Sequence, residues 1–221
     1  MCPMRTPLHL AALTAIACQS PVRTFDDSPV PQTVLAGISA HPDGEVHVAY
    51  RDLGAGAGWD VGGDAVVHAA STMKVPVMVA LHRRAHLGEL DLDMPILVRN
   101  AFESIVDGSP YALEIADDSD SELYEHIGEE LPASELSRRM IVRSSNLATN
   151  LLVAELGADE IQRTIEGLGV RKMRVLRGVE DIPAYRAGLS NTATANDLAA
   201  LLVAIAEGDA VSAGSWLARR L

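Results

Sequence analysis

The sequence predicts an α/β (α+β) fold, in which a group of helices accompanies a small antiparallel sheet. Residues 44–53, GEVHVAYRDL, alternate apolar and polar side chains, which is typical of a strand with one buried face. Residues 68–88 contain an apolar segment with little polar surface on any side, which is typical of a buried helix. Residues 132–157 predict two more helices, separated by a polar break.

The remaining elements follow from turn and capping signals. GAGAG at 54–58 predicts a turn, followed by a short second strand around residues 59–61. Further predictions are a helix at 158–169, an extended piece at 172–176, a loop at 177–191 and a last helix at 197–207, with Thr194 and Asp197 as its capping pair and Gly208 as its stop.

The net charge and the composition argue against some classes of binding partner. The chain has 221 residues and a formal net charge of −12, so it should repel nucleic acid and anionic lipid headgroups. No apolar stretch reaches the roughly 18 residues that a membrane span needs. Residues 114–130 carry eight acids and no Lys or Arg. They could form a docking face for a cation or a basic partner, but a solvated loop or an exposed helix is the favoured interpretation.

The N-terminus is typical of an exported protein. Residues 1–18 combine a basic residue with an apolar run, as in a signal peptide. The end of this segment resembles a bacterial lipoprotein box, which predicts lipidation at Cys18 and an envelope-anchored or periplasmic location. Ordinary cleavage after Ala17 is the alternative. Residues 19–43 then predict a tether, and residues 44–221 the folded domain.

Ser71 and Lys74 form the first candidate site. Lys74 is one of only two lysines and lies three residues after Ser71, so the two side chains share one helix face. A buried lysine can lose its proton and then act as a base toward a serine hydroxyl. The alternative is structural: a Ser or Thr caps the helix, and the lysine extends into solvent.

Ser144 and Asn146 form the second candidate site, in the break between the two predicted helices. A hydroxyl at this position could relay a proton to a leaving group, and an amide could bind a substrate amide. Alternatively, Ser145 or Asn146 simply caps the helix that begins at Leu147.

Both sites resemble motifs of one family. Ser71-Thr72-Met73-Lys74 resembles the Ser-x-x-Lys motif of class A β-lactamases and penicillin-binding proteins. Ser144-Ser145-Asn146 resembles their Ser-Asp-Asn motif, with serine in place of the middle aspartate. The resemblance covers about residues 44–208. It implies a helical subdomain and an antiparallel sheet of the β-lactamase/DD-peptidase-like fold.

The resemblance also implies roles for these residues. Ser71 would be acylated by a β-lactam or a peptidoglycan-like amide, and Lys74 would be the general base. Ser144 would pass a proton to the leaving nitrogen, and Asn146 would position the substrate. The protein would be a monomer that takes a small-molecule substrate and uses no cofactor and no metal. His82 and His86, four residues apart, lack the glutamate between them that a zinc motif would have.

Glu180, in RVLRGVED, is the best match to the glutamate that activates the deacylating water in class A enzymes. Arg177 would be the structural arginine of the same omega loop, and Asp181 is an alternative base. The match is imperfect, because Ala184 occupies the position where the family has asparagine. A solvated loop acid is the other interpretation of Glu180.

The third family motif, Lys-Thr-Gly, does not occur in the sequence. The resemblance therefore predicts an incomplete sheet and a C-terminally truncated domain. It leaves three functions open: a β-lactamase, a D-Ala-D-Ala peptidase or esterase that does not need fast deacylation, and an inactive, truncated envelope lipoprotein.

Overall fold

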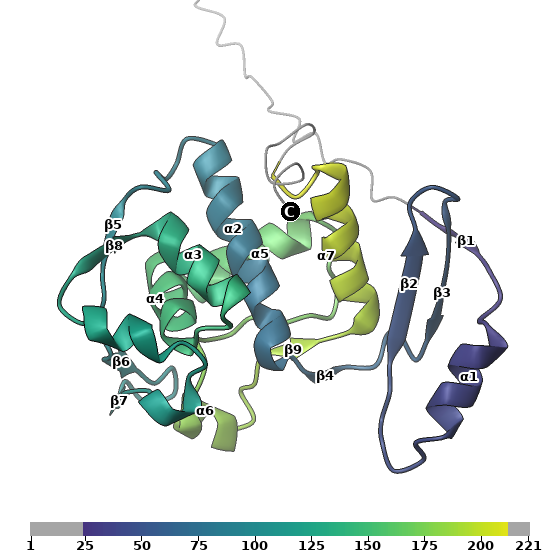
Figure 1. Ribbon diagram of the computed structural model, residues 1–221, viewed down its shortest axis with the longest axis horizontal. Helices are drawn as coiled ribbons and strands as arrows, with labels where there is room; N and C mark the ends of the chain where they lie inside the picture. Colours follow the sequence, from purple (N-terminus) through teal and green to yellow (C-terminus); the bar gives the residue numbers. More distant parts are fainter. Residues whose placement is uncertain (1–23, 212–221) are drawn as a thin grey trace, which may run out of the picture.

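The computed structural model describes residues 24–211, and the fold is mixed α+β, as predicted (Figure 1). The predicted signal peptide and Cys18 lie outside the described residues. In Figure 1 the helices α2 (Lys74–His86), α3 (Ala133–Val142), α4 (Asn146–Leu156) and α5 (Ala158–Gly167) form one body. The hairpin of β2 (Val48–Asp52) and β3 (Ala57–Val61) lies at the opposite end, and α7 (Ala195–Glu207) stands between them. The elements after the hairpin begin with β4 (Val67–His68), η1 (Ala70–Met73), α2 (Lys74–His86) and β5 (Pro95–Leu97).

The sheet beside α7 has three strands in the order β1-β3-β2. Strands β2 (Val48–Asp52) and β3 (Ala57–Val61) are antiparallel around the predicted glycine-rich turn, and β1 (Asp26–Asp27) adds to β3 in parallel. Because β1 and β2 flank β3, the outer edge of β2 has no strand partner among the described residues.

The structure corrects the prediction that residues 19–43 are only a tether. They contain β1 and an eight-residue helix, α1 (Gln32–Ser39). The sequence pattern did not indicate these elements, because a two-residue strand exists only through its partner and α1 buries none of its side chains.

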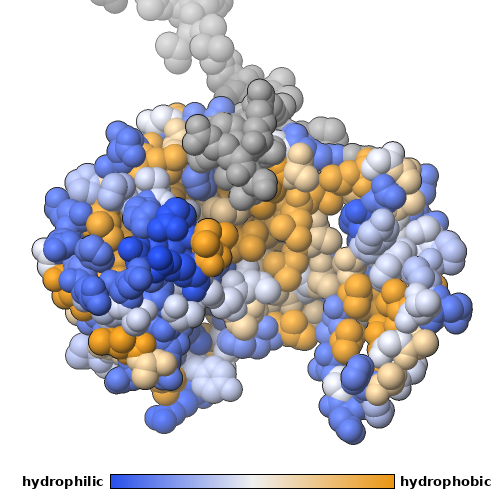
Figure 2. All heavy atoms as spheres, viewed as in Figure 1, coloured by the Kyte–Doolittle hydropathy of each residue, from blue (hydrophilic) through white to orange (hydrophobic). Residues whose placement is uncertain are grey.

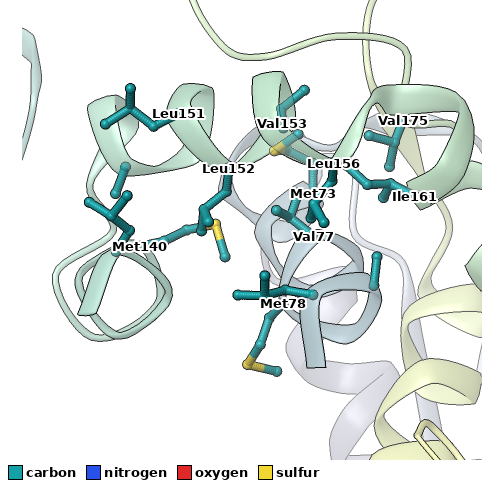
Figure 3. Close-up of a cluster of buried hydrophobic side chains, with 14 of the residues drawn as sticks. Met73, Val77, Met78, Met140, Leu151, Leu152, Val153, Leu156, Ile161 and Val175 are labelled. Atoms are coloured by element: carbon teal, nitrogen blue, oxygen red, sulfur yellow. The ribbon is translucent and has the colours of Figure 1, made fainter. Parts of the chain in front are cut away.

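Helix α2 lies at the centre of the helical body, where it packs against α3, α4, α5 and α7. It contains an unbroken buried run from Pro76 to His82, which confirms the prediction of a buried helix. Figure 3 shows Met73, Val77 and Met78 facing apolar side chains of the surrounding elements. The partners drawn there are Met140 from α3 (Ala133–Val142), Leu151, Leu152, Val153 and Leu156 from α4 (Asn146–Leu156), Ile161 from α5 (Ala158–Gly167), and Val175.

Short strand pairs tie the connecting segments together. Strand β4 pairs with β9 (Thr192–Ala193), so the chain entering α2 lies beside the end of the 177–191 segment. The amide of Ala69 also donates to the carbonyl of Asn191 at 3.0 Å. The other pairs are β5 with β8 (Glu130–Pro132), and β6 (Phe102–Glu103) with β7 (Pro110–Tyr111).

The acidic segment 114–130 agrees in part with its favoured interpretation as solvated surface, since six of its eight acidic side chains are exposed and two are buried. It forms two short 3-10 helices, η2 (Ile115–Asp117) and η3 (Ser121–His126), and ends in β8. Asp118 and Asp120 are buried. Asp120 accepts hydrogen bonds from Arg139 and Arg143 of the α3 region, so part of the acidic charge is neutralised inside the fold.

The structure confirms the predicted caps of the last helix. Helix α7 (Ala195–Glu207) begins after Thr194, whose hydroxyl accepts from the amide of Asp197 at 3.0 Å. It ends at Gly208, which has a left-handed φ of 84°. The segment before it, predicted as a loop, contains one short helix, α6 (Ile182–Arg186).

Apolar side chains gather around α7 and the neighbouring part of α2 on the face shown in Figure 2, whereas the surface over α3 is strongly hydrophilic. The side chain of Leu202 on α7, for example, is 56% exposed. Among residues 24–211, no helix is both long and apolar enough to span a bilayer.

Candidate active site

The side chains of Ser71 and Lys74 meet where η1 runs into α2. Lys74 Nζ lies 3.3 Å from Ser71 Oγ, as the three-residue spacing predicts. Ser71 is exposed, whereas Lys74 is only 3% exposed. A hydroxyl that solvent and ligands can reach therefore contacts an amine that is shielded from water.

The break between α3 and α4 supplies the other oxygens around this amine. Ser144 Oγ lies 2.9 Å from Lys74 Nζ and 3.1 Å from Ser71 Oγ. Lys74 Nζ also donates to the Ser144 carbonyl at 2.6 Å and to Asn146 Oδ1 at 2.9 Å. The three polar side chains thus form one continuous hydrogen-bond path from Ser71 through Lys74 to Ser144, along which a proton can move.

Burial lowers the pKa of Lys74 from its ordinary value, because removal from water disfavours the ammonium form. The negative charges of Asp118 and Glu180 oppose this effect. The neutral amine, which is the form that can accept a proton, therefore forms at a lower pH than in an exposed lysine.

Glu180 lies on the other side of Asn146. Its Oε1 accepts a hydrogen bond from Asn146 Nδ2 at 2.7 Å. Burial raises the pKa of Glu180, although this hydrogen bond acts in the opposite direction. Asn146 consequently connects the two residues: its side-chain oxygen accepts from Lys74, and its side-chain nitrogen donates to Glu180.

Two buried asparagines hold the segment that carries Glu180. Asn150 of α4 accepts from the amide of Val179 at 2.6 Å and donates to the carbonyl of the same residue at 3.0 Å. Asn191 accepts from the amide of Leu176 at 2.8 Å and donates to the carbonyl of Arg177 at 2.9 Å. These bonds fix the backbone at residues 176, 177 and 179, directly before Glu180, so that Glu180 has a defined position.

The side chains of Arg177 and Asp181 both form hydrogen bonds that stabilise the loop. Arg177 is buried and donates to the carbonyls of Gly178 and Leu189. Asp181, the alternative base, has both carboxylate oxygens engaged. One accepts from the Ser104 hydroxyl and the Ala184 amide, and the other accepts from the Ile105 amide.

Burial acts to raise the pKa of Asp181, but these hydrogen bonds and the charge of Arg177 together lower it. A carboxyl group with a lowered pKa is a weaker base, and this one is fully occupied by its donors. The geometry therefore favours Glu180 over Asp181 as the acid nearest to the Ser71 network.

Three of the candidate residues, Ser71, Asn146 and Glu180, border one cavity. Its volume is about 270 Å³, large enough for part of a small ligand. The rest of its lining is formed by His68, Ala70, Arg177, Val179, Asp181, Ile182, Tyr185 and Asn191.

Backbone strain is concentrated at the same place. Three non-glycine residues of the described chain have a positive φ: Ala70 at 44°, Ser144 at 57° and Glu180 at 62°. Such conformations cost of order 1–3 kcal/mol each and persist only where the surroundings enforce them. Each of the three residues either belongs to the candidate site or directly precedes Ser71.

Two residues that contribute to the site were not among the candidates. Asn150 could have been noticed as a polar side chain on an otherwise apolar helix. Asp118 gave no distinct signal within the acidic run.

His82, which was considered as a possible metal ligand, is buried, and burial lowers its pKa to about 4. No group of three or more His, Cys, Asp or Glu residues within 24–211 is placed to hold a metal ion.

Comparison with known proteins gives a consistent result. A family model described as the beta-lactamase enzyme family matches residues 31–216. A curated beta-lactamase from Rhodobacter capsulatus is 28% identical over 153 residues, which cover 69% of this chain and 46% of that protein. This chain therefore spans less than half of that curated relative.

Solved structures agree on the fold. A beta-lactamase from Sphaerobacter thermophilus matches with a TM-score of 0.67 and 29% identity, over 83% of this chain and 65% of that one. A point mutant of PBP-A, described as an acyl-enzyme complex with penicillin G, matches with a TM-score of 0.62 and 27% identity, over 82% and 62% of the two chains. These matches confirm the predicted β-lactamase-like fold.

Proposed function

This chain belongs to the beta-lactamase enzyme family, and on that premise we propose that it is a serine hydrolase in which Ser71 attacks the carbonyl carbon of a β-lactam or a related amide. One observation carries the proposal. The exposed Ser71 hydroxyl contacts the shielded amine of Lys74, and that amine also contacts the second hydroxyl, at Ser144.

In the proposed acylation, neutral Lys74 accepts the Ser71 proton while Oγ forms a bond to the carbonyl carbon. The tetrahedral intermediate then breaks its carbon–nitrogen bond. The leaving nitrogen takes the Ser144 hydroxyl proton, and Ser144 recovers a proton from the Lys74 ammonium, 2.9 Å away. Lys74 is neutral again at the end of the step. Glu180 can share the role of base through a water molecule.

In the proposed deacylation, Glu180 accepts a proton from water as the water oxygen attacks the acyl ester. The ester bond to Ser71 breaks, and Ser71 receives the proton back from Glu180. The raised pKa of Glu180 supports this role, because a stronger base removes a proton from water more readily. Asn146 has a second amide N–H besides the one that it donates to Glu180, and this N–H can bind a substrate carbonyl.

The first experiment detects the covalent intermediate. The protein is mixed with a penicillin, and its intact mass is measured over time, beside a Ser71→Ala variant. We expect the mass of the unmodified chain to increase by that of one penicillin, and the variant to remain unlabelled. If the native protein neither acquires an adduct nor hydrolyses the penicillin, or if Ser71→Ala acquires the same adduct, the proposal is wrong.

The second candidate is a D-Ala-D-Ala peptidase or esterase that shares the acylation machinery but turns over β-lactams slowly. The likeness to PBP-A supports it, as does Ala184, which offers no side-chain amide to the deacylating water. Glu180→Gln separates the two candidates. In a β-lactamase this variant accumulates an adduct that the native protein hydrolyses quickly. In the second candidate the native adduct is already long-lived, and the substitution changes little.

A further inference from the structure

Asp118 joins the acidic segment to the first turn of α4. It lies between η2 and η3 and is 8% exposed. Its Oδ1 accepts from the amide of Asn146 at 3.1 Å, and its Oδ2 accepts from the amide of Leu147 at 2.8 Å. These are the first two residues of α4, whose amides have no partner within the helix.

The Asp118 carboxylate is itself held in place. The Tyr124 hydroxyl donates to Oδ2 at 3.1 Å, and the Asp120 amide donates to Oδ1 at 3.0 Å. Each oxygen therefore has two donors, which leaves the carboxylate little freedom to move. Because it binds the helix through backbone amides, it fixes the position of Asn146 and, through the preceding peptides, that of Ser144.

Serine at position 145 explains why this contact matters here. The Ser145 hydroxyl accepts from the Ala148 amide at 3.2 Å and so caps α4, but it carries no charge. In the motif that Ser144-Ser145-Asn146 resembles, the middle residue is an aspartate. In this chain the negative charge at the start of the helix comes from a different segment, that of Asp118. There it also interacts favourably with the positive end of the helix dipole.

Charge links Asp118 to the reacting groups. Two carboxylates act on the buried amine of Lys74, Asp118 from the acidic segment and Glu180 from the 177–191 loop. The neighbouring Asp120 is committed to Arg139 and Arg143 instead. Asp118 is not hydrogen-bonded to Lys74, whose amine contacts Ser71, Ser144 and Asn146 instead, so it acts through its charge and through α4.

We propose that Asp118 is a positioning residue for Ser71 acylation, which sets the start of α4 so that Ser144 and Asn146 meet Lys74 and places a buried negative charge opposite the Lys74 amine. This inference rests on the proposed function, and it adds a residue outside both sequence motifs.

The test uses the scarcity of lysine in this chain. The full chain is labelled with ¹³C at lysine Cε, which gives two resonances, one from Lys74 and one from Lys172, assigned with Lys172→Arg. Titration follows the Lys74 midpoint in the native protein and in Asp118→Asn. We expect the midpoint to fall by about one pH unit in the variant, because a nearby opposite charge favours the ammonium form. The Lys172 resonance should titrate as in the native protein.

The second readout is the rate of Ser71 labelling by a fluorescent penicillin. Asp118→Asn removes the charge, while Asp118→Glu keeps it but moves the carboxylate by one methylene. We expect both to label about tenfold more slowly at the pH where each is fastest, because the start of α4 is displaced. Asp117→Asn removes an exposed neighbouring charge and should leave the Lys74 midpoint unchanged.

The outcomes separate the two proposals. A native-like Lys74 midpoint in folded Asp118→Asn overturns the role of Asp118, and so does native-like labelling of both Asp118 variants. If Asp118→Asn does not fold, Asp118→Glu decides, and a native labelling rate in that variant overturns the inference. If the native protein is never labelled and does not hydrolyse the penicillin, the proposed function fails instead.

Discussion

Lys74 contacts Ser144 twice, since its Nζ lies 2.6 Å from the carbonyl oxygen and 2.9 Å from the hydroxyl oxygen. Both contacts reach Ser144 because its φ of 57° turns the peptide and the side chain of one residue toward the same amine. Backbone strain and proton transfer thus meet in a single residue, and they can be separated by experiment.

Ser144→Gly and Ser144→Ala should have the same effect on acylation but different effects on stability. Both remove the hydroxyl, so we expect the acylation rate constant to fall by about 10²–10⁴. Only glycine adopts a left-handed φ without strain. Ser144→Gly should therefore be more stable than Ser144→Ala, by about 1 kcal/mol. Urea denaturation of the two variants measures this difference. Equal stabilities would show that the positive φ stores no strain.

Lys74→Arg should strongly slow acylation at every accessible pH, leaving only the part for which Glu180 can act as base. The guanidinium keeps a positive charge but does not lose its proton, so it cannot act as the base. In the native protein, we expect the labelling rate to rise with pH up to a midpoint below that of an ordinary lysine, because burial lowers the pKa of Lys74. Penicillin labelling from pH 5 to 10 measures both effects. A rapidly labelled Lys74→Arg protein would assign the base role to another group.

Asn150→Ala should slow deacylation more than acylation. The substitution removes the side chain that binds both the amide and the carbonyl of Val179, next to Glu180, whereas Ser71 and Lys74 keep their contacts. We also expect a stability loss of about 1–3 kcal/mol from the unpaired backbone groups. Mass spectrometry of the penicillin adduct over time resolves the two steps. Asn191→Ala, which frees residues 176 and 177 of the same loop, is the comparison variant.

His82 should make the fold sensitive to acid. Its pKa is lowered to about 4 in the folded state, from an ordinary value of 6.5, because burial disfavours the imidazolium. Between these two values the unfolded chain binds more protons than the folded one. The contribution is therefore fully present above pH 6.5 and is lost as the pH falls toward 4.

The loss is on the order of 3 kcal/mol at most. His82→Leu should remove this part of the pH dependence, which denaturant unfolding at pH 5 and pH 7 can measure. A variant with the same difference between the two pH values as the native protein would show that His82 does not titrate on unfolding.

The local elements were largely predictable from the sequence. The hairpin, the buried helix α2, the break between α3 and α4, and the capped helix α7 each have a strong local signal, either a regular periodicity or a capping pair. The i, i+3 contact between Ser71 and Lys74 follows from helix geometry alone. The elements that were missed, among them β1, α1, α6 and the short strands β4 to β9, are short and carry no such period.

Pairwise chemistry between distant segments was not predictable in the same way. The choice between Glu180 and Asp181 depends on donors from residues 104 and 105, which lie far away in the chain. Asp118 was one acid among eight until folding placed it against the amides of α4.

The sequence by itself determined which side chains could do the chemistry, since the residue types and their spacing along a helix or a helix break are local properties of the chain. Only the tertiary structure decided which carboxylate faces the Lys74 amine and which is committed to holding a loop. The physical reason is that burial and charge act through space, so neighbours 44 or 106 residues apart in the chain, such as Asp118 and Glu180 around Lys74, set its protonation together.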